Sequence, residues 1–67
     1  MLYKNEYEVI ERNERVELIK ERVWKYDPVE NKTYGSPEIY YHVNEINGDW
    51  LRSYKTLKEA KTAYRDL

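Results

Sequence analysis

Apolar and aromatic residues are concentrated in two short runs, residues 38–46 and 49–54, on either side of the turn dipeptide Asn47-Gly48. Asn-Gly strongly favours a two-residue type I′ turn, because both central positions of that turn need positive φ. The sequence therefore predicts a β-hairpin, with one strand over residues 38–46 and its partner over residues 49–54. This turn also sets the register, whose expected opposite pairs are Ile46–Asp49, Glu45–Trp50, Val43–Arg52 and Tyr41–Tyr54.

Opposite residues of a hairpin share one face of the sheet, so this register sorts the side chains into two sets. The first set is mostly apolar and forms the predicted core face; it comprises Ile39, Tyr41, Val43, Trp50 and Tyr54. The other set forms what we call the second face; in the hairpin it comprises Tyr40, His42, Asn44, Ile46 and Leu51.

A helix is predicted directly after the hairpin. Thr56 and Glu59 have the spacing of a capping box, in which the hydroxyl and the carboxylate each accept from a backbone N–H at the helix start. The residues that follow place one apolar stripe along the helix at 100° per residue, and this stripe comprises Leu57, Ala60, Ala63, Tyr64 and Leu67. We expect the stripe to pack on the core face of the hairpin.

The first half of the chain carries a weaker pattern. Residues 3–12 alternate between apolar and polar side chains, which predicts a strand. Residues 15–26 fit two interpretations: a helix capped by Asn13, or a strand whose apolar residues fall on both faces. The β-branched and aromatic residues at the end of this segment favour the strand, which then requires either a bulge or partial cover of both faces.

Residues 27–37 contain Asp-Pro, Asn-Lys and Gly-Ser-Pro, which are typical of turns, and show no periodicity. They are predicted to form a long loop. The whole chain, residues 1–67, is then a single α+β domain: a meander-like antiparallel sheet of about four strands with one carboxy-terminal helix packed on one face, in the order ββ-loop-ββα.

Composition narrows the possible functions. The 67 residues include no cysteine and a single histidine, so neither a disulfide framework nor a typical zinc site is expected, and no cofactor is predicted. Charged residues form 37% of the chain but nearly cancel, to a formal charge of −1, which argues against general affinity for nucleic acids. Nothing resembles a signal peptide or a membrane span, so a cytoplasmic location is expected.

Catalysis has little support in the sequence. The candidate pair is His42 with Ser53, which the hairpin register sets opposite each other on the second face. No third group is evident that would orient the histidine, and no glycine-rich loop offers a cradle for an anion. A surface hydrogen bond is therefore the expected role of this pair, and a non-enzymatic function is predicted.

DNA binding is an alternative hypothesis. Residues 41–67, with a turn glycine, an aromatic strand and a Thr-Leu-Lys-Glu-Ala helix start, resemble the sheet-plus-helix amino-terminal domain of phage integrases. That resemblance implies a sheet inserted into a DNA groove, and the residues available to contact phosphates are Arg52, Lys55, Lys58, Lys61 and Arg65. The predicted strands depart from the integrase pattern because they are rich in glutamate, which would repel phosphates.

Protein binding is the favoured hypothesis. A second face with aromatic and apolar side chains needs either a cover or a partner, and the candidate contact residues are Tyr40, His42, Ile46, Leu51 and Trp24. The cover could be the loop over residues 27–37 together with the first residues of the chain, and this alternative stays open. The chain is also similar in general appearance to small accessory proteins of bacteriophages and prophages. That resemblance implies a small intracellular regulator or adaptor that binds and modulates a host protein; self-association as a homodimer or structural homo-oligomer is the further alternative.

Overall fold

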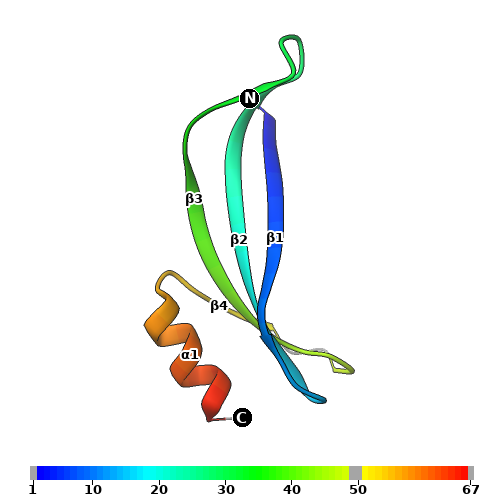
Figure 1. Cartoon of the computed structure of the whole chain (residues 1–67), viewed down its shortest axis with the longest axis vertical. Helices are drawn as coiled ribbons and strands as arrows, with labels where there is room; N and C mark the ends of the chain where they lie inside the picture. The colour runs from blue at the N-terminus through cyan, green and yellow to red at the C-terminus, as the bar shows by residue number, and fades with distance from the viewer. Residues whose placement is uncertain (1, 49–50, 67) are drawn as a thin grey trace.

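The computed structural model of the chain describes residues 2–48 and 51–66, and it has an α+β fold. Four antiparallel strands form one sheet in the order β1-β2-β3-β4, and one helix follows them (Figure 1). The bounds of the elements are β1 Leu2–Arg12, β2 Val16–Asp27, β3 Lys32–Glu45, β4 Leu51–Tyr54 and α1 Leu57–Arg65. Each strand pairs with its neighbour in the sequence, as predicted for a meander.

The strand interpretation of residues 15–26 is confirmed, because this segment forms most of β2. A tight connection precedes it, in which the Asn13 side-chain oxygen accepts from the backbone N–H groups of Arg15 and Val16 at 2.8 and 2.9 Å. This contact turns the chain back on itself, so Asn13 closes a hairpin instead of capping a helix.

The predicted long loop over residues 27–37 is wrong. The turn is confined to residues 28–31, where Asn31 adopts a φ of 53°, and Lys32 already pairs with Asp27. The Gly-Ser-Pro segment lies inside β3, at a register shift where Gly35 has a φ of 72°. Glycine tolerates this conformation and proline lacks a ladder donor, so a bulge accommodates both residues within a strand.

The β3–β4 hairpin keeps the predicted register but not the predicted turn. Tyr41 lies opposite Tyr54 and Val43 opposite Arg52, while the two pairs expected nearer the turn involve residues 49 and 50, outside the described ranges. Among the described residues positive φ occurs at Asn31 and Gly35 and not at the predicted turn, which excludes type I′ geometry there. The backbone N–H of Ile46 donates to the Arg15 carbonyl at 2.9 Å, so the residue that follows β3 is bonded to the connection between β1 and β2.

The buried core joins both hairpins to the helix. Leu18 of β2 lies opposite Val43 of β3, and these two residues form a cluster with Ala60 of α1, all three with 0% exposure. Half-buried apolar residues contact this cluster: Ile10, Tyr41, Tyr54, Leu57, Ala63 and Tyr64. We call the side of the sheet that carries Leu18 and Val43 the helix-side face; it includes the predicted core residues Tyr41, Val43 and Tyr54.

The helix begins at the predicted residue. The Thr56 hydroxyl accepts from the backbone N–H of Glu59 at 3.2 Å, as expected for an N-cap, and it donates to the Glu59 carboxylate at 2.8 Å. The carboxylate therefore contacts the capping hydroxyl, which holds that hydroxyl at the helix end. The helix α1 packs on the end of the sheet where β2 begins and β3 ends. At their opposite ends, β1, β2 and β3 extend well beyond α1 (Figure 1).

Candidate functional site

The second face of the sheet runs across all four strands. Residues that lie opposite each other on neighbouring strands form rows across this face. One row contains Tyr7, Glu21 and Tyr40, and the next row contains Val9, Ile19, His42 and Ser53. The next row carries Asn44 and Leu51. Because opposite residues share a face, side chains separated by up to 46 positions in sequence come together here.

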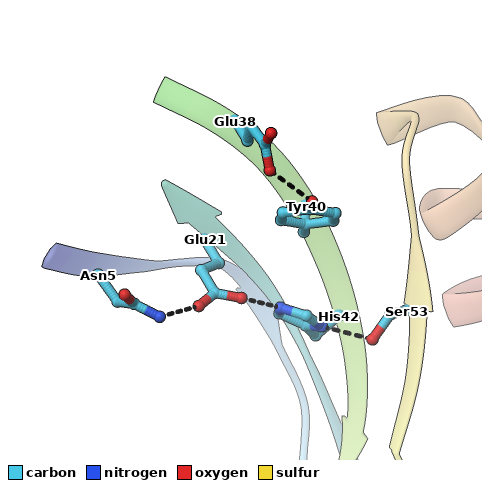
Figure 2. A network of polar contacts seen from close by, with 6 residues as sticks. All are labelled: Asn5, Glu21, Glu38, Tyr40, His42 and Ser53. Carbon is cyan, nitrogen blue, oxygen red and sulfur yellow. Dashed lines mark hydrogen bonds and ion pairs between the residues drawn. The ribbon is translucent and has the colours of Figure 1, made fainter. Parts of the chain in front are cut away.

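A chain of hydrogen bonds crosses the second face (Figure 2). The Asn5 amide donates to Glu21 Oε2 at 2.6 Å, and Glu21 Oε1 lies 2.6 Å from Nε2 of His42. On its other side, Nδ1 of His42 lies 2.7 Å from the Ser53 hydroxyl. One residue from each strand therefore contributes, and the side chains of Glu21 and His42 are mostly buried, with 13% and 16% exposure.

The electrostatics of this network favour an ionised glutamate. The hydrogen bond from His42 is the main cause that lowers the pKa of Glu21 below its usual value of 4.5, and further hydrogen bonds from Tyr7 and Asn5 act in the same direction. Desolvation opposes them by raising the pKa. Hydrogen bonds to the charged form outweigh the cost of burial, so Glu21 is held as a carboxylate.

This pKa shift predicts a dependence of stability on pH. A carboxyl group whose pKa is depressed by folding stabilises the protein above its unfolded pKa, and that contribution is lost as the pH falls through the folded pKa. We therefore expect acidification from pH 6 to pH 3 to lower the free energy of unfolding more in the wild type than in Glu21→Gln, as measured by urea titrations. Glu30→Gln in the exposed 28–31 turn is the control and should follow the wild type. If acid lowered the free energy of unfolding equally in Glu21→Gln and in the wild type, the lowered pKa of Glu21 would be wrong.

The order carboxylate, imidazole and hydroxyl has the chemical logic of an activated serine. The sequence analysis was wrong in finding no group that orients His42, because Glu21 does so. Nucleophilic catalysis also needs donors that converge beside the reacting oxygen. The backbone groups of β4 alternate between β3 and the free edge of the sheet, as in any strand, and therefore do not converge on Ser53. The network links one side chain from each of the four strands.

Two shallow pockets lie along the second face. The first has a volume of about 350 Å³ and is lined by Tyr7, Ile19, Glu21, His42, Asn44 and Leu51. The second has a volume of about 380 Å³ and is lined by Tyr3, Val23, Lys25, Ser36, Glu38 and Tyr40. In the lining of the second pocket, the Tyr40 hydroxyl donates to Glu38 at 2.7 Å, and this contact raises the pKa of Tyr40. Each pocket combines an apolar floor with a polar side chain that is already oriented.

Large apolar side chains remain exposed on this face. The exposed fractions are 60% for Tyr3, 65% for Tyr7, 54% for Val9 and 58% for Leu51. The alternative in which residues 27–37 cover the second face is wrong, because these residues continue the sheet through the β2–β3 hairpin. Within residues 2–48 and 51–66, the helix packs against the opposite, helix-side face, and these four side chains each keep more than half of their surface exposed.

The structure brings some of the predicted contact residues together and separates others. His42 and Leu51 line the first pocket, and Tyr40 lines the second. Ile46 follows the end of β3, where its backbone is bonded to Arg15. Trp24 lies on the helix-side face, beyond the helix, where its indole N–H donates to Glu6. It therefore does not belong to the same surface as Tyr40 and Leu51.

The sequence analysis missed Asn5 and Glu21 as members of the site. Their positions on the second face depend on the registers of β1 with β2 and of β2 with β3, which no turn motif indicated. The signal that could have placed Asn5 on this face is the alternation within residues 3–12, which puts Tyr3, Tyr7 and Val9 on one side of a strand. Asn5 has the same parity, and its short amide fits a partner on the neighbouring strand.

Most of the predicted phosphate-contact residues lie apart from this site, and Lys55 is the exception. Arg52 is opposite Val43 on the parity of the helix-side face, and Lys55 follows β4, where it lines a third pocket with Glu38, Ile39 and Tyr40. On α1, Lys58, Lys61 and Arg65 share a stripe at a spacing of three and four residues. Among the residues described, no cluster of histidine, cysteine and carboxylate side chains could hold a metal ion.

The comparisons add no assignment. A scan against models of protein families, a search of curated proteins and a search of solved structures each find no match to the chain. The resemblances to phage accessory proteins and to the integrase domain therefore stay predictions. Of the helices in the described part of the chain, none is long and apolar enough to cross a membrane.

Proposed function

We propose that this chain is a small, non-enzymatic binding module, a regulator or adaptor whose second face contacts another protein. The observation that carries the proposal is the exposure of Tyr3, Tyr7, Val9 and Leu51 on one continuous sheet surface. Exposed apolar groups that gather on one surface, with polar groups between them, are typical of association sites. In this proposal α1 packs on the helix-side face alone and leaves the second face to the partner.

The chemistry of the second face suits a protein partner. Tyrosine offers a large apolar ring and a polar tip, and it loses little conformational entropy on binding, because only two torsions are fixed. The hydrogen-bond network holds Glu21 and His42 in one arrangement before a partner arrives. A surface that is ordered in advance loses less free energy on association than one that must be ordered by the partner.

The test compares two leucines of similar exposure on opposite faces. Leu51 is 58% exposed on the second face, whereas Leu2 is 54% exposed and pairs with Tyr26 on the other side of the sheet. Tagged wild type, Leu51→Glu and Leu2→Glu are used to capture proteins from the native cell after nuclease treatment, and their folds are checked by circular dichroism. We expect Leu51→Glu to lose specific partners that Leu2→Glu retains.

Two outcomes would overturn the proposal. One is a partner captured equally by all three proteins. The other is capture that disappears on nuclease treatment and also disappears when Lys58 and Lys61 are reversed in charge. That second result would favour the nucleic-acid alternative, because a basic helix stripe contacts phosphates through charge.

A further inference from the structure

The outer edge of β1 is the longest regular edge of the sheet. β1 is an outer strand that pairs with β2 alone, and its residues from Leu2 to Val9 alternate regularly before a bulge begins. The outward backbone groups of such an edge are a template for another strand unless charges or a cover block them. Every side chain from Leu2 to Val9 is exposed, so among the described residues no side-chain packing protects this edge.

The charges of β1 become complementary when the strand is paired with a copy of itself. Two antiparallel copies of one strand are related by a two-fold axis perpendicular to the sheet, and opposed residues then share a face. An axis through Lys4 or through Glu6 would oppose that residue to its own charge, and an axis through Tyr7 would oppose Glu6 to Glu8. An axis through Asn5 sets Lys4 of each copy opposite Glu6 of the other, and Tyr3 opposite Tyr7.

We propose that two copies of this chain associate through β1, antiparallel and centred on Asn5. This register contains two Lys4–Glu6 pairs and two Tyr3–Tyr7 pairs, both of which are favourable cross-strand combinations. In the single chain both side chains contact β2: Lys4 Nζ lies 5.9 Å from the centre of the Tyr26 ring, and Glu6 accepts from Trp24, so Lys4 turns away from Tyr26 to reach Glu6 of the other copy. One carboxylate oxygen of Glu6 accepts from Trp24 of the same chain. In the proposed dimer, its other oxygen accepts from Lys4 of the other copy.

The paired sheet has eight strands, and both helices lie on the same side of it. The second faces of the two copies then form one surface, in which the exposed Tyr3 and Tyr7 side chains of both copies meet at the centre. Tyr3 and Tyr7 belong both to the second face and to the paired strands, so self-association and partner binding use neighbouring surfaces, whereas Leu51 belongs to the second face alone. The number of paired residues is small, and the dimer is expected to be weak and dependent on concentration.

Charge exchange between Lys4 and Glu6 tests the register. Lys4→Glu and Glu6→Lys each convert both ion pairs into repulsions, and we expect each to weaken the dimer about tenfold or more in sedimentation equilibrium. The double variant Lys4→Glu/Glu6→Lys restores opposite charges in this register and should dimerise like the wild type. A mixture of the two single variants should form a heterodimer, because each then supplies what the other lacks. Glu30→Lys in the exposed turn is the control for net charge.

A cysteine at the axis provides a second test that does not depend on charge. The chain contains no cysteine, so Asn5→Cys should form an intermolecular disulfide on mild oxidation, whereas Tyr3→Cys should do so far more slowly because Tyr3 faces Tyr7. A wild type that remains monomeric at millimolar concentration would overturn the proposal. So would a dimer that survives Lys4→Glu and Glu6→Lys but is lost in Leu51→Glu, since that result assigns self-association to the second face.

Discussion

Leu18→Ala should remove a large part of the free energy of unfolding of this protein. Leu18 is fully buried between β3 and α1, where it contacts both Val43 and Ala60. Truncation of a buried leucine lowers the free energy of unfolding by about 3 kcal/mol, since it removes apolar contacts and leaves a cavity. A domain of 67 residues has a total stability of about 3–10 kcal/mol, so this single loss consumes a large part of it. Urea titration followed by circular dichroism measures the change.

Two variants separate the cavity from other effects. Leu18→Met keeps nearly the same volume and should cost less than about 1.5 kcal/mol. Leu2→Ala removes the same atoms from a side chain that is 54% exposed, and its effect should be a small fraction of that of Leu18→Ala. A loss at Leu18 no greater than at Leu2 would contradict the core described above.

Ala60→Leu should displace the helix from the sheet. Ala60 is fully buried against Leu18 and Val43, which are themselves fully buried, so three added carbon atoms have no free space to enter. Overpacking of this kind costs about 1–3 kcal/mol. Displacement of α1 would also expose Tyr41 and Tyr54, which contact the same cluster. The expected result is a lower urea midpoint together with increased exposure of these tyrosines, measured by ultraviolet difference spectroscopy.

Lys58→Leu is the matched control for this helix. Lys58 is exposed on α1, and lysine and leucine have similar helix propensities. The control adds apolar volume to the same helix without entering the core, and it should leave the unfolding midpoint nearly unchanged. If both substitutions had equal effects, the close approach of α1 to the sheet at Ala60 would be wrong.

The carboxy-terminal part of the fold was the most predictable from the sequence because its signals are local. Thr56 and Glu59 lie within one helical turn, and their contact depends on little else in the protein. The register that places Tyr41 opposite Tyr54 follows from where the chain reverses, and it holds even though the turn itself has another geometry. At the start of this turn the backbone of Ile46 donates to Arg15 of the other hairpin, and no local motif encodes such a contact.

The segment over residues 27–37 was mispredicted because its local preferences and its tertiary role differ. Its proline, glycine and asparagine residues favour turns wherever they occur. In the structure β2 provides a partner strand for them, and pairing of Tyr26 with Thr33 and of Asp27 with Lys32 outweighs those preferences. The same residues then serve specific positions within the hairpin, with Asn31 in the turn and Gly35 at the bulge.

The second face was only half predictable for a related reason. The parity of β3 and β4 placed His42 and Leu51 on it, but the contribution of β1 and β2 needed registers set by packing. The apolar residues of β2 fall on both parities, and the structure shows that β2 serves two surfaces at once. Leu18 lies in the core, while Ile19 lines a pocket on the second face. The two neighbouring strands carry the register shifts, so the alternation of β2 itself is uninterrupted.

The order of the elements also determines when the core can form during synthesis. Each strand pairs with the one made just before it, so the ribosome releases β1, β2 and β3 as successive hairpins that can pair at once. The buried core shared by these hairpins forms later than the strand pairs, because it includes Ala60, which belongs to α1, the last element of the described chain. Leu18 and Val43 are translated long before the helix that buries them, and the nascent sheet must present them to water or to a chaperone until α1 emerges.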